Sequence, residues 1–408
     1  MSSKGFTSSL PFKLILALIL GILVGLGLNS IEGSAFCTAI LNVIVTIRQI
    51  SGQFINFCVP LIIIGFVAPS ITRLGANASK MLLLALILAY VSSIGAAFFA
   101  VGAGYTILPF MNIVSQVEGL KSLPSVVFAL TIPQVMPVMS ALVLSITVGL
   151  AATWTKSPHM TALLEEFQEI VLKIVKAFLI PLLPVLIGTT FCGFAYEGSL
   201  TKQLPIFIAI ILIVIIGHYI WLALLYFLAG AYSGHNPLKI LSNYGPAYMT
   251  AIGTMSSAAT LSVALECAKK SEPPLRDDMI NFGIPLFANI HLCGSVMTET
   301  FFVMAVSKIL YGAYPTVGNM VLFALLLGIF AIAAPGVPGG TVMASLGLIT
   351  GVLGFDTTGT ALMLTIFALQ DSFGTACNVT GDGALTLILT GYAEKHNIKS
   401  ENLGNILD

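Results

Sequence analysis

Most of the chain is a succession of long apolar runs with short polar interruptions, which is the pattern of helices that cross a lipid bilayer. A helix needs about 20 apolar residues to span a hydrocarbon core about 30 Å thick. Eight runs reach this length, so the sequence predicts an all-α polytopic membrane protein with eight transmembrane helices. These runs lie at residues 10–31, 38–69, 79–108, 124–154, 167–195, 203–231, 278–309 and 357–393.

Two further apolar segments, 237–267 and 315–353, are each interrupted near the middle by small residues. The interruptions read Gly-Thr-Met-Ser-Ser-Ala-Ala-Thr at 253–260 and Ala-Pro-Gly-Val-Pro-Gly-Gly-Thr at 334–341. Each half is too short to cross a membrane, so we expect two re-entrant helical hairpins whose tips meet. Paired interruptions of this kind indicate inverted repeats around a transport site.

Closely spaced prolines lie within the fourth and fifth predicted spans. Because proline lacks a backbone N–H and clashes with the preceding turn, it breaks or kinks a helix. We therefore expect kinks in the fourth span at Pro133 and Pro137, and in the fifth span at Pro181 and Pro184.

Composition and charge agree with a membrane protein. Of the 408 residues, 57% are hydrophobic and only 8% are charged, whereas about a quarter are charged in soluble domains. The formal net charge is zero and no basic tail is present, so the sequence does not predict a nucleic-acid partner. The first apolar run lacks a small-residue cleavage site, which argues against a cleavable signal peptide. The six cysteines have no paired spacing and are expected to be buried thiols.

The distribution of basic residues predicts the orientation of the chain. With the N-terminus inside, most lysines and arginines lie on the cytoplasmic side, while Lys121, Lys202 and Lys308 lie outside and Arg48 lies within the second span. This bias predicts that both termini are cytoplasmic. We expect the protein in a bacterial inner membrane, surrounded by lipid.

The last apolar run contains the strongest candidate for a binding site. Residues 369–382 include two aspartates, Asp371 and Asp382, which bracket an amide and several hydroxyls. A carboxylate at mid-bilayer depth costs about 3 kcal/mol even on insertion scales, so it usually faces a cavity, a partner or an ion. No lysine or arginine lies in this span to pair with either aspartate.

Four motifs, in this order and spacing, resemble the dicarboxylate/amino acid:cation symporter family. The resemblance covers nearly the whole chain. It implies a homotrimeric secondary transporter rather than an enzyme, in which a moving transport domain (77–110 and 201–408) works like an elevator against a fixed scaffold (1–76 and 111–200). The motifs are 136–149, Ser256 to Leu261, Gly336 to Gly339, and Asp371 to Asp382 with its Asn-Val-Thr-Gly-Asp ending.

The resemblance also implies roles for individual residues. Asp371 would bind the substrate's amino group, and Asp382 would ligate sodium with help from Asn378, Asn289 and His291. Oxygen ligands suit a hard cation, and a broken helix frees carbonyls to supply them. The substrate itself would contact residues of both hairpin tips and of the last two spans: Ser257, Val337, Gly339, Ser295, Asp371, Gly374, Thr375 and Asn378.

Two departures from the family bear on the substrate. Gly374 stands where members that carry acidic substrates have an arginine, and Met255 stands at the first hairpin's arginine position. A second substrate carboxylate would be buried without a guanidinium, a loss of about 3–5 kcal/mol. The sequence therefore favours a small neutral amino acid.

The seventh span departs further, because it reads His291-Leu292-Cys293-Gly294-Ser295 where the family has Asn-Met-Asp-Gly-Thr. A thiol is a poor sodium ligand, so one cation site is expected to be missing or altered. Glu299 lies eight residues after His291, about two helical turns on, so we expect the two side chains to share a face, and the pair is a candidate for proton coupling. The alternative is a hydrogen-bonded buried histidine and a glutamate that is satisfied by hydroxyls of the third span, such as Ser92 or Ser93.

Together these observations predict a symporter for a serine-, threonine- or alanine-like amino acid, with sodium and in part protons as coupling ions and no organic cofactor. The alternative within transport is a proton- or sodium-coupled carrier of dicarboxylates or acidic amino acids. A channel or a substrate sensor that has lost coupling is the alternative from another class. An enzyme is disfavoured because His291 and Cys293 have no third ligand or oriented base beside them.

Overall fold

A computed structural model describes residues 10–75, 80–111, 113, 121–198, 200–271, 274–334 and 336–398. These residues form helices and contain no strand, which confirms the all-α prediction within them. The N-terminal helices are α2 (Leu10–Ser30), α3 (Ala35–Gly75), α4 (Lys80–Ile107, continued by the 3-10 turn η1, Leu108–Met111), α5 (Val138–Trp154), α6 (Pro158–Ile174) and α7 (Ile180–Glu197). The C-terminal helices are α8 (Leu200–Ser233), α9 (Leu238–Leu241), α10 (Gly245–Thr254), α11 (Ser257–Lys269), α12 (Asp277–Ile290), α13 (Cys293–Tyr311), α14 (Val317–Ala333), α15 (Gly340–Gly351) and α16 (Thr357–Lys395).

Six helical segments of the described chain are long and apolar enough to cross a membrane, and they correspond to the predicted spans one, two, three, five, six and seven. The eighth predicted span is α16, which has 39 residues but carries the polar groups of the candidate site. All six cysteines are free and buried. The membrane topology and the position of the termini remain predictions, since residues 1–9 and 399–408 lie outside the described part.

The prediction for the fourth span is wrong in its first half. Residues 124–137 are not helical, and α5 begins only at Val138, directly after Pro137. Pro124, Pro133 and Pro137 recur too often for an uninterrupted helix, because each removes a backbone donor. In the fifth span the prolines only disturb the helix: α6 and α7 are joined by one π-helical turn, Val175–Leu179, just before Pro181.

Both predicted interruptions are present. The first hairpin breaks between α10 and α11 at Met255 and Ser256, and the second breaks between α14 and α15, where residue 334 and residues 336–339 are not helical. The two tips are in direct contact, because the Ser256 hydroxyl donates a hydrogen bond of 2.6 Å to the carbonyl of Gly336. Ser256 also caps α11 by accepting from the backbone N–H of Ala259.

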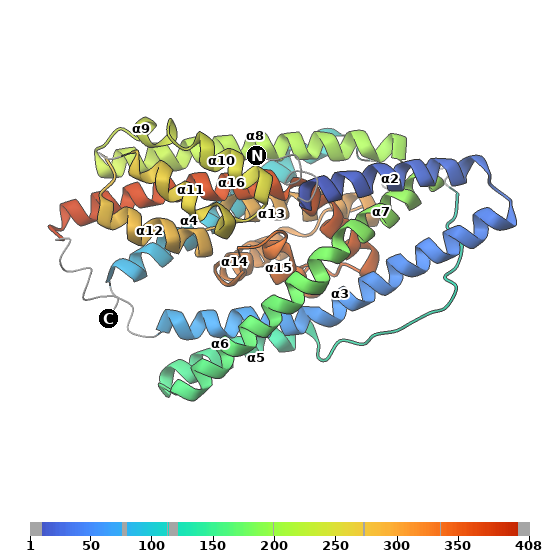
Figure 1. The fold of residues 1–408 in the computed structure, drawn as a ribbon, viewed down its shortest axis with the longest axis horizontal. Helices are drawn as coiled ribbons and strands as arrows, with labels where there is room; N and C mark the ends of the chain where they lie inside the picture. Colours follow the sequence, from blue (N-terminus) through green and yellow to red (C-terminus); the bar gives the residue numbers. More distant parts are fainter. Residues whose placement is uncertain are drawn as a thin grey trace.

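The helices pack in two groups (Figure 1). In the first, α2 lies along α7, and α3 contacts α5, α6 and α7. In the second, α16 runs through the middle of the group and contacts α8, α10, α12 and α13, while α4 packs on α13 and α14. The groups meet where α3 contacts α14, α15 and α16, where α5 contacts α15, and where α7 contacts α16.

Contact between α2 and α7 is unusually close. A Cβ atom added to Gly21 would overlap the carbonyl oxygen of Gly188, and one added to Gly25 would overlap the carbonyl oxygen of Cys192. Small residues let two apolar helices bring their backbones together, as is common inside membranes. By contrast, an apolar pocket of about 310 Å³ separates parts of α3, α4 and α14.

Candidate functional site

Asp371 lies on α16 directly against the tip of the second hairpin. One of its carboxylate oxygens accepts a hydrogen bond of 2.7 Å from the backbone N–H of Gly339, and the Thr375 hydroxyl bonds the same side chain. Gly339 can present this N–H because its φ of +69° is in the left-handed region, which favours glycine. Asp371 is 4% exposed, and no lysine or arginine pairs with it among the described residues. The carboxylate is therefore positioned to accept a cationic group.

The seventh predicted span is not one helix. α12 ends at Ile290 and α13 begins at Cys293, with His291 and Leu292 in non-helical conformations between them. The break exposes the first N–H groups of α13, and Asn378 of α16 binds them: its Oδ1 accepts from Gly294 at 2.7 Å and from Ser295 at 3.2 Å. Its Nδ2 donates to the Ser295 hydroxyl at 2.9 Å. Asn378 thus caps a broken helix in the manner of an N-cap residue.

Gly374, one turn before Asn378, faces the same end of α13. A Cβ atom at Gly374 would lie 3.3 Å from the backbone and hydroxyl of Ser295, which is tight contact. An arginine at this position would require α13 or α16 to shift. The packing therefore agrees with the absence of a guanidinium that the sequence indicates.

His291 occupies the helix break and joins two other spans. Its Nδ1 lies 2.9 Å from Oδ1 of Asp382 on α16, and its Nε2 lies 2.9 Å from the hydroxyl of Ser92 on α4. The exposed fractions of these side chains are 0% for His291, 1% for Asp382 and 5% for Ser92. The second oxygen of Asp382, Oδ2, has no partner among the described residues. Gly381 leaves room for the imidazole, because a Cβ there would lie 2.9 Å from its Cε1.

The expected pairing of His291 with Glu299 is wrong. Because the helix is broken at residues 291–292, the two side chains do not share a helical face. Oε1 of Glu299 instead accepts a short hydrogen bond from the hydroxyl of Ser345 on α15, and Oε2 has no partner among the described residues. Ser92, a hydroxyl of the third span, forms its hydrogen bond with His291 and not with Glu299.

The remaining predicted residues divide between the tips and the surface. Ser257 begins α11 and is buried, and Val337 is half-buried in the second tip. Asn289 is exposed, and its amide donates to the carbonyl of Pro285 on its own helix. The structure does not bring Asn289 to the Asp382 group.

Sequence reasoning missed several residues of this region. His218 of α8 is buried and lies 3.0 Å from the carbonyl of Gly294 and 3.1 Å from the Thr298 hydroxyl, so it supports the same helix break. Tyr226 of α8 donates to the carbonyl of Thr380 beside Asp382. A lone histidine in an otherwise apolar run was the available signal for His218; nothing distinguished Tyr226 from packing aromatics.

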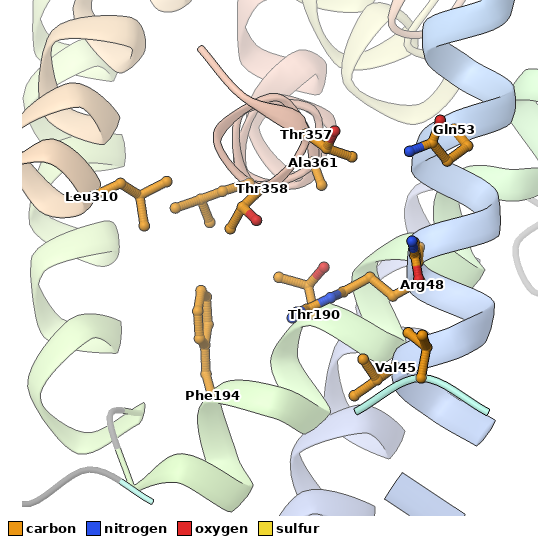
Figure 2. Close-up of a pocket in the computed structure, with 12 residues that line it drawn as sticks. Val45, Arg48, Gln53, Thr190, Phe194, Leu310, Thr357, Thr358 and Ala361 are labelled. Atoms are coloured by element: carbon orange, nitrogen blue, oxygen red, sulfur yellow. The ribbon is translucent and has the colours of Figure 1, made fainter. Parts of the chain in front are cut away.

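Arg48 does not belong to this site. It lines a pocket of about 280 Å³ between α3, α7 and the start of α16, where it extends toward Thr190 (Figure 2). Leu310, Thr357 and Thr358 lie on the other side of that pocket. No described contact links Arg48 to Asp371 or to the hairpin tips. Among the described residues, the candidate substrate site is therefore bounded by an aspartate and amide groups without a guanidinium.

Comparison with known proteins identifies the family. The model of the sodium:dicarboxylate symporter family matches residues 10–392. Similar proteins include a putative sodium-dependent excitatory amino acid transporter, glt-4, of Caenorhabditis elegans, 26% identical over 39% of this chain and 31% of its own length. They also include excitatory amino acid transporter 2 of Homo sapiens, 27% identical over 44% and 31% respectively, and that of Mus musculus, 26% identical over 56% and 40%. The matched parts thus span less than half of each relative. With a family match across almost its whole length, the chain belongs to the sodium:dicarboxylate symporters, a family of transporters rather than enzymes.

Proposed function

We propose that this chain is a secondary active symporter that takes up a small neutral amino acid, of the serine, threonine or alanine kind, together with sodium. The observation that carries the proposal is the buried Asp371 carboxylate, which meets the N–H of Gly339 and no basic side chain among the described residues. An ammonium group removed from water needs an anionic acceptor of this kind. A carboxylate on the substrate's side chain would have no matching guanidinium.

The substrate's α-carboxylate would be held by groups at the hairpin tips and on α16. Ser257 at the start of α11 and Thr375 beside Asp371 offer hydroxyls, and the first N–H groups of α11 favour an anion. Asn378 would help to shape this part of the site, because its capping of α13 holds Ser295 toward Gly374.

Sodium would be carried at Asp382. Its unpartnered Oδ2 is a hard anionic ligand, and the broken helix beside it leaves backbone carbonyls to complete the shell. His291 takes the place of a further cation ligand, and its contacts with Asp382 and Ser92 support a reduced sodium requirement. Protons carried by His291, or separately by Glu299, would then complete the coupling.

The wider architecture follows the family. The packing of α4, α8 and α10–α15 with α16 supports a transport domain that moves against a scaffold of α2, α3 and α5–α7. The proposal includes a homotrimer in a bacterial inner membrane with both termini in the cytoplasm. Native mass measurement of the detergent-solubilised protein tests the trimer.

Uptake into proteoliposomes tests the function. We expect labelled serine to accumulate under an inward sodium gradient, and we expect Asp382→Ala to abolish accumulation. Asp277→Ala removes an exposed aspartate at the start of α12 and serves as the matched control. If only a proton gradient drives accumulation, or if Asp382→Ala accumulates serine as well as the wild type does, the assignment of sodium to Asp382 is wrong.

The second candidate function is transport of a dicarboxylate or an acidic amino acid. The family description and the names of the excitatory amino acid transporters favour it. Competition decides between the two: excess aspartate or succinate leaves serine uptake unchanged if the substrate is neutral, and suppresses it if the site accepts a second carboxylate.

A further inference from the structure

Two buried polar side chains near Asp371 lack partners that their burial requires. Gln370 is 0% exposed, yet neither its amide nitrogen nor its oxygen has a hydrogen-bond partner among the described residues. Glu299 is also 0% exposed, and its Oε2 is likewise unpartnered. Buried polar side chains in folded proteins nearly always have a partner, so three such atoms point to a bound group.

The register of α13 and α16 places these two residues at the same level of the helix pair. His291 contacts Asp382, and four residues later Ser295 contacts both Asn378 and Gly374. Residue numbers along α16 therefore fall as those along α13 rise. The two helices are therefore antiparallel in this region. Side chains four residues apart lie on one face of a helix. One turn beyond the contact between Ser295 and Gly374, the facing residues are Glu299 and Gln370.

This position adjoins the amino-group site. Gln370 precedes Asp371 in α16, and Glu299 is bonded through Oε1 to Ser345 of α15. The hairpin that contains α15 also supplies the Gly339 N–H to Asp371. A ligand whose ammonium lies at Asp371 would thus extend its side chain toward the wall formed by α13, α15 and α16.

We propose that Gln370 and Glu299 bind the substrate's side chain and select an uncharged polar group, a hydroxyl or a carboxamide. The inference rests on the proposed transport of a neutral amino acid. The Gln370 carboxamide offers two donors and an acceptor, and Glu299 offers an oxygen. A side-chain carboxylate would meet the Glu299 carboxyl without a cation, while an aliphatic side chain would leave the polar atoms unpaired. Sites built to hydrogen-bond a substrate group reject analogues that lack it.

Transport selectivity of the full chain in proteoliposomes tests the inference. Uptake of labelled serine, asparagine and alanine is measured for the wild type, Gln370→Leu and Glu299→Gln. We expect Gln370→Leu to lower serine and asparagine uptake about tenfold relative to alanine uptake, which is the size of effect expected for the loss of one hydrogen bond. Thr365→Val is the matched control, because its buried hydroxyl bonds only its own helix, at the carbonyl of Ala361.

The outcomes separate the two proposals. Wild-type uptake with an unchanged ratio of serine to alanine in Gln370→Leu overturns the side-chain assignment alone. A wild type that takes up none of the three amino acids overturns the proposed function and this inference with it. If Gln370→Leu fails to fold, Gln370→Met, which is unbranched like glutamine, provides the same comparison.

Discussion

Asn378 offers a direct test of how the broken helix is held. In Asn378→Ala the N–H groups of Gly294 and Ser295, which now donate to Oδ1 at 2.7 and 3.2 Å, lose their acceptor. Each buried donor left unpaired costs about 1–3 kcal/mol, so we expect the free energy of unfolding to fall by about 2–6 kcal/mol. For a chain of 408 residues, per-residue unfolding entropies convert this loss into a Tm lower by about 2–7 °C.

Asn378→Asp separates capping from other effects of the substitution. It keeps an oxygen for both N–H groups and places a negative charge at the N-terminus of α13, which the helix dipole favours. The Ser295 hydroxyl can rotate to donate to this carboxylate. Unfolding of both variants in the same detergent, followed by size-exclusion chromatography after heating, measures the difference. If Asn378→Ala melts with the wild type, the capping argument is wrong, whereas a low melting temperature of Asn378→Asp would measure the cost of a further buried carboxylate.

Three further perturbations follow from the described contacts. Asp371→Asn removes the anionic partner of the substrate's ammonium and should lower affinity about a hundredfold, a change of about 3 kcal/mol; binding measured by calorimetry checks it, and retained affinity would count against the assignment. Gly381→Ala adds a methyl group 2.9 Å from the His291 ring and should impair cation-driven uptake, whereas Gly102→Ala, with no described atom within 4 Å of the added group, should not. Ser256→Ala removes the bond between the hairpin tips and the cap of α11, and should lower stability by about 1 kcal/mol and speed proteolysis at the tips; equal digestion of both proteins would contradict this.

Hydropathy predicted most helices because their apolar length is a local property of the sequence. It failed over residues 124–137, where the mean hydropathy is high but recurring prolines remove backbone donors. It also joined α12 and α13 into one span, because nothing in the apolar pattern marks the break at His291. That break depends on Asn378, which lies 84 residues from Gly294 in the chain and supplies the acceptor that makes a second helix start possible.

The candidate site shows the same division between local and distant information. That Asp371 and Asp382 are buried in the last span could be predicted, and buried carboxylates are costly wherever they occur, which marks them as candidates. Their partners could not, because the pairing of His291 with Asp382 and of Glu299 with Ser345 depends on how three helices are aligned. A two-turn spacing suggested instead that His291 and Glu299 act together, which holds only on an unbroken helix.

The glycines of α2 determine which parts of the molecule can shear. Where a carbonyl of α7 fills the space beside Gly21 and Gly25, a slip of one residue would place a side chain in that space and stop. The close contact therefore resists sliding of α2 along α7. Where α3 faces α4 and α14, the helices are instead separated by the apolar pocket, so no backbone contact of that kind opposes their sliding. In the proposed elevator movement, sliding would therefore occur where α3 faces α4 and α14 and not between α2 and α7.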